Sequence, residues 1–244
     1  MQMPQTDVPC VTAEQMREVD RAMVEGLGIG LIQMMESAGR HLAHLARSRF
    51  LDGDPVGRVV TVLAGSGGNG GGALVCARRL HTWGAEVTVV LARDTDAFVP
   101  ASAHQWEILT RMGVAVLGAD AVSHAPQGGL IVDGILGYSL AGAPRGASAD
   151  LVRWANGCAT TVLALDVPSG VDAGCGTVYD PAIRATATLT LALPKCGLFS
   201  AAAAPYVGEL YLADIGVPAA VYQAPSLGLT VGPLFAREEI IRLS

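Results

Sequence analysis

Residues 62–80 read VLAGSGGNGGGALVCARRL, and this stretch decides the fold. It predicts a buried strand, a loop with six glycines in eight residues (65–72), and then a helix. Glycines let backbone N–H groups approach a ligand closely, and the start of a helix favours an anion such as a nucleotide phosphate. Gly65, Gly67 and Gly70 fit the pattern G-x-G-x-x-G, which is weak evidence in a chain with 30 glycines. No Gly-Lys-Ser/Thr follows, so the segment is not a Walker loop, and a tight turn without a ligand is the alternative.

The rest of the chain alternates apolar strands with helices, which predicts an α/β fold with a mostly parallel sheet covered on both faces. Thr12 is a plausible N-cap with Gln15 as its capping-box partner, and it opens a helical region. We expect one domain over residues 1–244, with N-terminal helices at 12–50, an αβα core at 58–215 and a C-terminal tail at 216–244. The expected strands are 58–64, 86–92, 114–117, 129–135, 160–166, 187–193 and 209–215, and the core helices are 71–83, 100–112 and 148–156.

Composition excludes several classes of function. A net charge of −6 over 244 residues leaves no dense basic patch for nucleic acid. Neither a signal peptide nor a transmembrane helix is expected, because no basic region precedes an apolar run at the N-terminus and no uncharged apolar run reaches about 18 residues. The sequence therefore predicts a globular protein whose partner is a small molecule.

The five cysteines predict a cytoplasmic location. Their number is odd, their spacing is scattered and no C-x-x-C occurs, which favours reduced thiols over a disulfide framework or a zinc site. Cys196 follows Lys195 directly, and we interpret it as a small buried side chain, with a reactive thiol as the alternative.

Polar residues stand where four of the expected strands end. They are Asn69, Asp133, Asp166 with Ser169, and Lys195. Ligands of open parallel sheets bind beyond the carboxyl ends of the strands, so we expect these side chains to share one edge. Taken singly, a strand-end aspartate is more often a helix cap or a turn former than a catalytic group. Four such residues at one edge favour a functional site.

Five segments in a fixed order carry a family resemblance that runs from about residue 11 to residue 215. They resemble the NAD(P)H-hydrate epimerase family, also called the YjeF N-terminal domain, whose motifs include G-x-G-N-N-G-G-D-G, D-A-L-F-G-T-G and D-I-P-S-G-L-D-A. The matching segments are Met35-Glu36-Ser37-Ala38-Gly39, Gly65-Ser66-Gly67-Gly68-Asn69-Gly70-Gly71-Gly72-Ala73, Asp133-Gly134-Ile135-Leu136-Gly137-Tyr138-Ser139, Asp166-Val167-Pro168-Ser169-Gly170-Val171-Asp172-Ala173 and Pro194-Lys195-Cys196-Gly197.

The resemblance implies a Rossmann-like αβα sandwich and an isomerase that interconverts the R and S hydrates of NADH and NADPH, a metabolite repair step. It implies a potassium ion held by Asn69, Asp133 and Ser169, whose oxygen donors suit an alkali cation. Asp166 would contact substrate opposite Lys195, and such a pair can transfer the proton that epimerisation requires. The residues implied for substrate binding are Gly68, Asn69, Gly70, Gly71, Gly72, Gly137, Tyr138, Ser139, Leu140, Ala141, Gly142, Ala143 and Asp166.

The sequence also departs from the family motifs. Gly68 stands for an Asn, Gly72 for an Asp, Ala73 for a Gly, and Tyr138-Ser139 for Thr-Gly. These changes remove a loop carboxylate and add a bulky side chain to the pocket wall. The alternatives to a hydrate epimerase are therefore an isomerase or cyclase for another small molecule and a non-catalytic nucleotide-binding module.

Two partners are expected. Apolar residues of the N-terminal helices could cover a homodimer surface, namely Ile29, Leu31, Ile32, Met34 and Met35. The dehydratase that is often fused to this family would be a separate protein, because the chain stops at Ser244.

Overall fold

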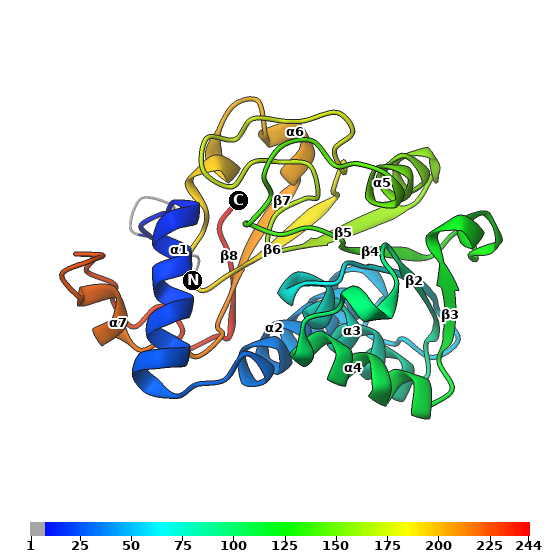
Figure 1. The fold of residues 1–244 in the computed structure, drawn as a ribbon, viewed down its shortest axis with the longest axis horizontal. Helices are drawn as coiled ribbons and strands as arrows, with labels where there is room; N and C mark the ends of the chain where they lie inside the picture. The colour runs from blue at the N-terminus through cyan, green and yellow to red at the C-terminus, as the bar shows by residue number, and fades with distance from the viewer. Residues whose placement is uncertain (1–7) are drawn as a thin grey trace.

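The computed structural model describes residues 8–244, which form one eight-stranded sheet in the order β3-β2-β1-β4-β5-β6-β7-β8 (Figure 1). Strands β1 to β7 pair in parallel, and β8 runs antiparallel to β7. The predicted α/β class with a mostly parallel sheet is therefore confirmed. The strands are β1 Val59–Ala64, β2 Glu86–Leu91, β3 Ala115–Gly118, β4 Leu130–Gly134, β5 Thr161–Leu165, β6 Ala187–Leu191, β7 Glu209–Ala213 and β8 Ile240–Arg242.

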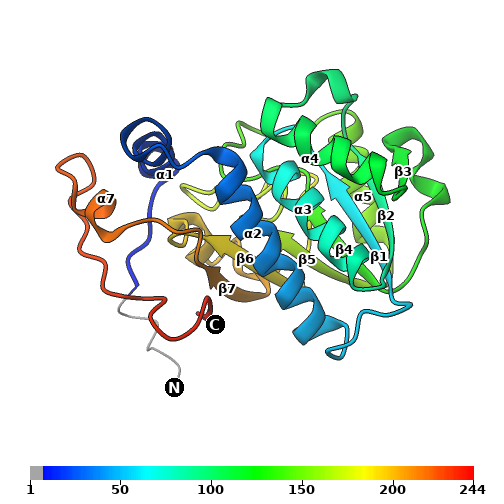
Figure 2. The same ribbon diagram turned by 90° about the horizontal axis from the view of Figure 1, so that it is seen from below.

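Helices cover both faces of the sheet (Figures 1 and 2). On one face lie α2 (Leu31–Leu45), α3 (Gly68–Thr82) and α4 (Pro100–Arg111), and on the other lies α5 (Ala147–Gly157). At the β6–β7 end, α1 (Ala13–Arg21) packs against α7 (Ala219–Gln223) through apolar side chains. The shorter helical segments are η1 Ala22–Gly26, η2 Ala46–Phe50, η3 Thr95–Ala97, η4 Ala119–His124, η5 Cys196–Phe199 and α6 Ala204–Val207.

Two glycines allow backbones to approach closely where β1 turns into α3. A Cβ atom on Gly70 would lie 1.8 Å from the carbonyl oxygen of Gly65, so only glycine closes this turn. A Cβ on Gly39 would lie 2.4 Å from the carbonyl oxygen of Gly72, which brings α2 against α3. The helix begins at Gly68, three residues before the predicted start at residue 71.

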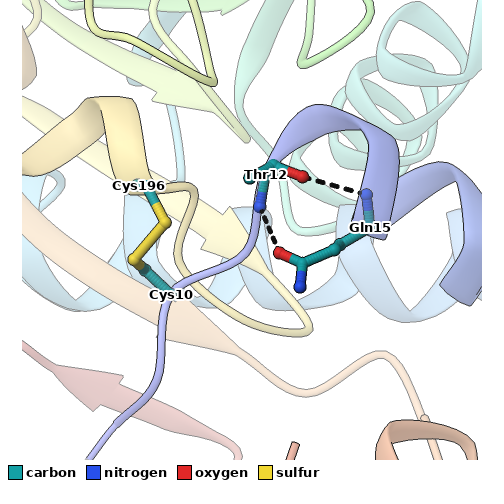
Figure 3. Close-up of a disulfide and its surroundings, with 4 residues drawn as sticks. All are labelled: Cys10, Thr12, Gln15 and Cys196. Atoms are coloured by element: carbon teal, nitrogen blue, oxygen red, sulfur yellow. Dashed lines mark hydrogen bonds between the residues drawn. A yellow bond between two sulfur atoms is a disulfide. The ribbon is translucent and has the colours of Figure 1, made fainter. Parts of the chain in front are cut away.

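The N-terminal segment is tied to the loop after β6, and a disulfide joins Cys10 to Cys196 (Figure 3). Val11 forms a parallel bridge with Lys195, and the Thr12–Gln15 capping box then starts α1, as predicted. The expectation of reduced thiols was therefore wrong for Cys10 and Cys196, whereas Cys76, Cys158 and Cys175 are free. The two cysteines are 186 residues apart, so their pairing leaves no local pattern in the sequence.

Residues 216–244 are more ordered than the expected tail. They contain α7 and end in β8, which extends the sheet beside β7. Among residues 8–244, no helix has the length and apolar character needed to cross a membrane.

Candidate active site

A cavity of about 730 Å³ opens at the carboxyl edge of the sheet. Its walls come from the turn after β1, the segment after β2, the loop between β4 and α5, and the ends of β5 and β6. Helices α1 and α2 close it on one side with Met16, Met34 and Met35. Because Met34 and Met35 are 4% and 3% exposed, they are not available for the expected dimer surface, whereas Leu31 and Ile32 are exposed.

Asp166 and Lys195 form a buried ion pair inside this cavity. The Lys195 ammonium group also donates to the carbonyl oxygen of Leu191 at 2.9 Å, and the second Asp166 oxygen accepts the backbone N–H of Tyr138 at 3.0 Å. Asp166 adopts a φ of +66°, a conformation that non-glycine residues rarely take and that is frequent at functional sites. Lys195 is the only lysine of the chain, and it is fully buried.

Tyr138, one of the departures from the family motif, connects this pair to α1. Its hydroxyl donates to Asp20 at 2.5 Å, and the Lys195 ammonium lies 5.9 Å from the centre of its ring. Burial raises the pKa of Asp20, and the hydrogen bond from Tyr138 opposes that rise. Burial and the same hydrogen bond raise the pKa of the Tyr138 hydroxyl. Asp20 thus joins the site from a helix that the strand-end rule does not consider.

Asp133, near the end of β4, is hydrogen-bonded to Ser169, in the segment after β5, and neither residue lines the cavity. The Ser169 hydroxyl donates to one Asp133 oxygen at 2.6 Å, and the Ser169 N–H donates to the other at 2.8 Å. Asn69 lies beside them and donates to the carbonyl oxygen of Leu136 at 3.0 Å. Burial raises the pKa of Asp133 to about 6, although the hydrogen bonds from Ser169 and Ile135 limit the rise.

This second cluster fits a monovalent cation. Asp133 is fully buried and has no ion-pair partner within residues 8–244, so its negative charge lacks compensation. The carbonyl oxygen of Leu136 lies 3.3 Å from the Ser169 hydroxyl, which gathers carboxylate, hydroxyl and carbonyl oxygens around one point. Oxygen donors of this kind suit hard cations. A different type of metal site, with three or more His, Cys, Asp or Glu side chains, does not occur in the part of the chain that the structure describes.

The predicted substrate-binding glycines fall into two groups. Gly68 lines the cavity, and a Cβ there would meet only distant side-chain atoms, the nearest at 3.9 Å. Gly70 and Gly71 are buried inside α3 and stand outside the cavity wall. Gly72 does line the cavity, but a Cβ there would lie 2.9 Å from Leu165, so Gly72 and the leucine fit each other.

The loop after β4 forms the facing wall. Gly137, Tyr138, Ser139, Leu140, Ala141 and Ala143 line the cavity, and Gly142 turns the loop with a φ of +86° outside it. The structure adds Arg93 and Arg145 to the lining. Arg93 follows the second strand, so the rule that found Asp133 and Asp166 could have found it.

The fold and the site together define a class of protein: a Rossmann-like α/β protein with a buried acid–lysine pair at the carboxyl edge of its sheet. The chain belongs to the family described as YjeF-related protein N-terminus, whose profile matches residues 31–197. This match confirms the resemblance on which the predicted site rests.

Relatives of two lengths match the chain. An NAD(P)H-hydrate epimerase of Dehalogenimonas lykanthroporepellens is 41% identical, over 93% of this chain and 89% of the relative. A bifunctional NAD(P)H-hydrate repair enzyme of Salinibacter ruber is 36% identical, over 86% of this chain but only 41% of the relative. The crystal structure of the yeast protein ynu0 shares the fold, with a TM-score of 0.76 over 96% of this chain and all of the yeast chain at 24% identity.

Proposed function

We propose that the chain is an NAD(P)H-hydrate epimerase, an isomerase that interconverts the R and S hydrates of NADH and NADPH. The observation that carries this proposal is the buried Asp166–Lys195 pair in a cavity at the carboxyl edge of the sheet. The proposal is supported by relatives that bear this activity in their names, one of which the chain covers over 89% of its length.

The pair suits the chemistry. Inverting a carbon that bears a hydroxyl requires a proton to be given and taken as a bond at that carbon breaks and re-forms on the other face. We assign this proton transfer to Asp166, whose orientation the Tyr138 N–H fixes. Lys195 provides the opposite charge beside the carboxylate as the proton moves. Burial of both groups strengthens their interaction, because little water screens it.

We further propose that Asp133, Ser169 and Asn69, with the carbonyl oxygen of Leu136, hold a potassium ion. The buried Asp133 carboxylate without a cationic partner among residues 8–244 supports this assignment. When bound, a monovalent cation supplies positive charge beside the substrate pocket. Asp133 and Ser169 also fix the loop after β4, since Leu136 N–H donates to the Ser169 hydroxyl at 2.9 Å.

The remaining proposals concern partners and location. We propose a dehydratase as a functional partner, since the chain matches two fifths of a relative named as a bifunctional NAD(P)H-hydrate repair enzyme. Val24, Leu27, Leu31 and Ile32 are between 40% and 52% exposed and form the surface that we propose for a homodimer. We propose a cytoplasmic location, which fits a substrate derived from nicotinamide cofactors. A reducing compartment would keep Cys10 and Cys196 as thiols in the cell, although the folded structure brings their sulfur atoms within bonding distance. Thiol trapping in intact cells tests this, and a fully formed disulfide there would contradict it.

The function is tested by following epimer exchange directly. One epimer is removed selectively from a mixture of hydrated NADH, and NMR then follows its return with and without the protein. We expect the protein to accelerate that return. If neither hydrated NADH nor hydrated NADPH responds, Gly72 and Tyr138 are the first residues to change. Gly72→Asp together with Tyr138→Thr should then restore activity only if the protein is an epimerase whose site has diverged. Leu165→Ala is added because a side chain at residue 72 would otherwise meet Leu165.

A further inference from the structure

The functional side chains follow the order of the strands along the carboxyl edge. Lys195 follows β6, Asp166 follows β5, the glycine turn follows β1, and Arg93 follows β2. Neighbouring strands lie about 4.8 Å apart, so the four steps from β6 to β2 cover about 19 Å. Figure 1 shows β2 and β6 on opposite sides of β4 and β5, and the strand order places β1 between β2 and β4. A ligand of two linked nucleotides spans such a distance, whereas a bare nicotinamide ring does not.

Arg93 stands at the far end of this row. It is the second residue after β2, it lines the cavity, and it is exposed. Within residues 8–244 it makes no ion pair and no side-chain hydrogen bond, unlike Arg78 and Arg79, which both bind Glu36. Its guanidinium group is therefore available for an anion that enters the cavity.

The position after β2 has a known meaning in sheets with this strand order. Where the order is 3-2-1-4-5-6, the residue beyond the second strand reads the 2′ position of the adenosine ribose. An acidic residue accepts a hydrogen bond from a 2′-hydroxyl, and an arginine accommodates a 2′-phosphate. Here Arg93 lines the cavity, whereas the adjacent Asp94 does not.

We propose that Arg93 binds the 2′-phosphate of hydrated NADPH and makes the chain prefer the phosphorylated substrate. This inference rests on the proposed function, because it takes the reacting ring to lie at Asp166 and Lys195. The guanidinium group pairs with phosphate through two parallel hydrogen bonds, which a ribose hydroxyl cannot provide. Arg93 is thus a specificity-determining residue and takes no part in proton transfer.

The test compares Arg93→Gln with the parent protein on both hydrates. We expect KM for hydrated NADPH to rise about 10- to 100-fold, the usual effect of losing a charge-assisted hydrogen bond, with kcat unchanged. The constants for hydrated NADH stay within about twofold, and Arg93→Lys restores part of the preference. The matched control is Arg145→Gln, which removes the same charge from the same cavity. Equal losses for both hydrates, no loss, or the same selective loss in Arg145→Gln would overturn the proposal.

Binding without turnover separates this inference from the proposed function. Calorimetry with 2′,5′-ADP and with 5′-ADP, at two salt concentrations, measures the contribution of the 2′-phosphate. We expect the parent protein to bind 2′,5′-ADP more tightly and Arg93→Gln to lose that difference. If the parent protein epimerises neither hydrate, the proposed function fails, and a loss confined to 2′,5′-ADP still supports the phosphate site. An unchanged affinity for 2′,5′-ADP in Arg93→Gln overturns the site whatever the activity.

Discussion

Asp133 and Asp166 are buried carboxylates at the ends of neighbouring strands, and they differ in what balances their charge. Asp166 pairs with Lys195, the only lysine of the chain. Asp133 receives only neutral donors, from Ser169 and Ile135. Burial costs both groups hydration. Asp166 has its countercharge within the chain, and we propose that Asp133 takes one from solution. A place at the end of a parallel strand thus predicts where a buried acid lies. The charge of its neighbours then determines whether that acid forms an ion pair within the chain.

Replacing the paired acid should have the largest effect. Asp166→Asn removes the proton-transfer group and lowers the epimerisation rate about 10²- to 10⁴-fold. The fold persists because asparagine has nearly the same shape, so the melting temperature changes little. Epimer exchange by NMR and thermal unfolding on the same sample measure both. A strongly lowered melting temperature with a normal specific activity of the folded fraction would instead show that Asp166 only shapes the turn after β5.

Removing the lysine should destabilise the protein. Lys195→Met leaves Asp166 buried without a countercharge, which costs about 3–5 kcal/mol. Adding Asp166→Asn recovers much of this loss, because no charge is then left unpaired. Urea unfolding of the two single variants and the double variant gives the coupling energy. For contrast, Asp133→Asn in potassium-free buffer removes a buried charge but also one hydrogen-bond acceptor, so it should cost less than Lys195→Met. A loss as large as that of Lys195→Met would contradict the comparison.

The disulfide beside the paired acid gives a third test. Cys10→Ser frees the N-terminal segment that bridges Lys195, and removal of a native disulfide lowers unfolding free energy by about 2–4 kcal/mol. Cys175→Ser is the matched control, because that exposed cysteine is free. Denaturant unfolding with and without reductant measures the effect. Equal behaviour of the two variants would mean that the bridge adds nothing to stability.

The unpaired acid predicts a response to potassium. A cation bound at Asp133 stabilises the folded state by about 1.4 kcal/mol at a concentration ten times its dissociation constant. Thermal unfolding in potassium chloride against choline chloride at equal ionic strength measures this, and Asp133→Asn should abolish the difference. Asp166→Asn should retain it. A potassium response that survives Asp133→Asn would place the cation elsewhere.

The smallest effect is expected at Tyr138. Tyr138→Phe removes the hydrogen bond to Asp20 and costs about 1 kcal/mol of stability, since one half-buried carboxylate oxygen loses its donor. Asp20→Asn, which keeps an acceptor, should cost less. Urea unfolding distinguishes the two. A larger loss of unfolding free energy in Asp20→Asn than in Tyr138→Phe would contradict this account of the hydrogen bond.

The strand-end rule predicted the meeting of Asp133, Ser169, Asp166 and Lys195, because parallel strands bring their carboxyl ends to one edge. It could not predict Asp20, because the path of α1 over this edge depends on a bridge between residues far apart in the sequence, Val11 and Lys195. The disulfide and β8 escaped for the same reason, since both are long-range pairings without local periodicity.

The glycine-rich turn was predicted as a site of close ligand approach, and the structure divides its roles. Gly68 faces the cavity, while Gly70 is required by the backbone of Gly65. Sequence alone does not separate these roles, because both demand the absence of a side chain.

Because the chain has a single lysine, chemical labelling of Lys195 can report when the cavity opens. Every amine-directed reagent that modifies a side chain of this chain must modify Lys195, and that amine is sealed in the folded molecule. The rate at which Lys195 is labelled therefore measures how often local opening exposes it to solvent. Substrate in the cavity should lower the labelling rate of Lys195. Mass spectrometry of the peptide that contains Lys195 can therefore follow ligand binding without an activity assay.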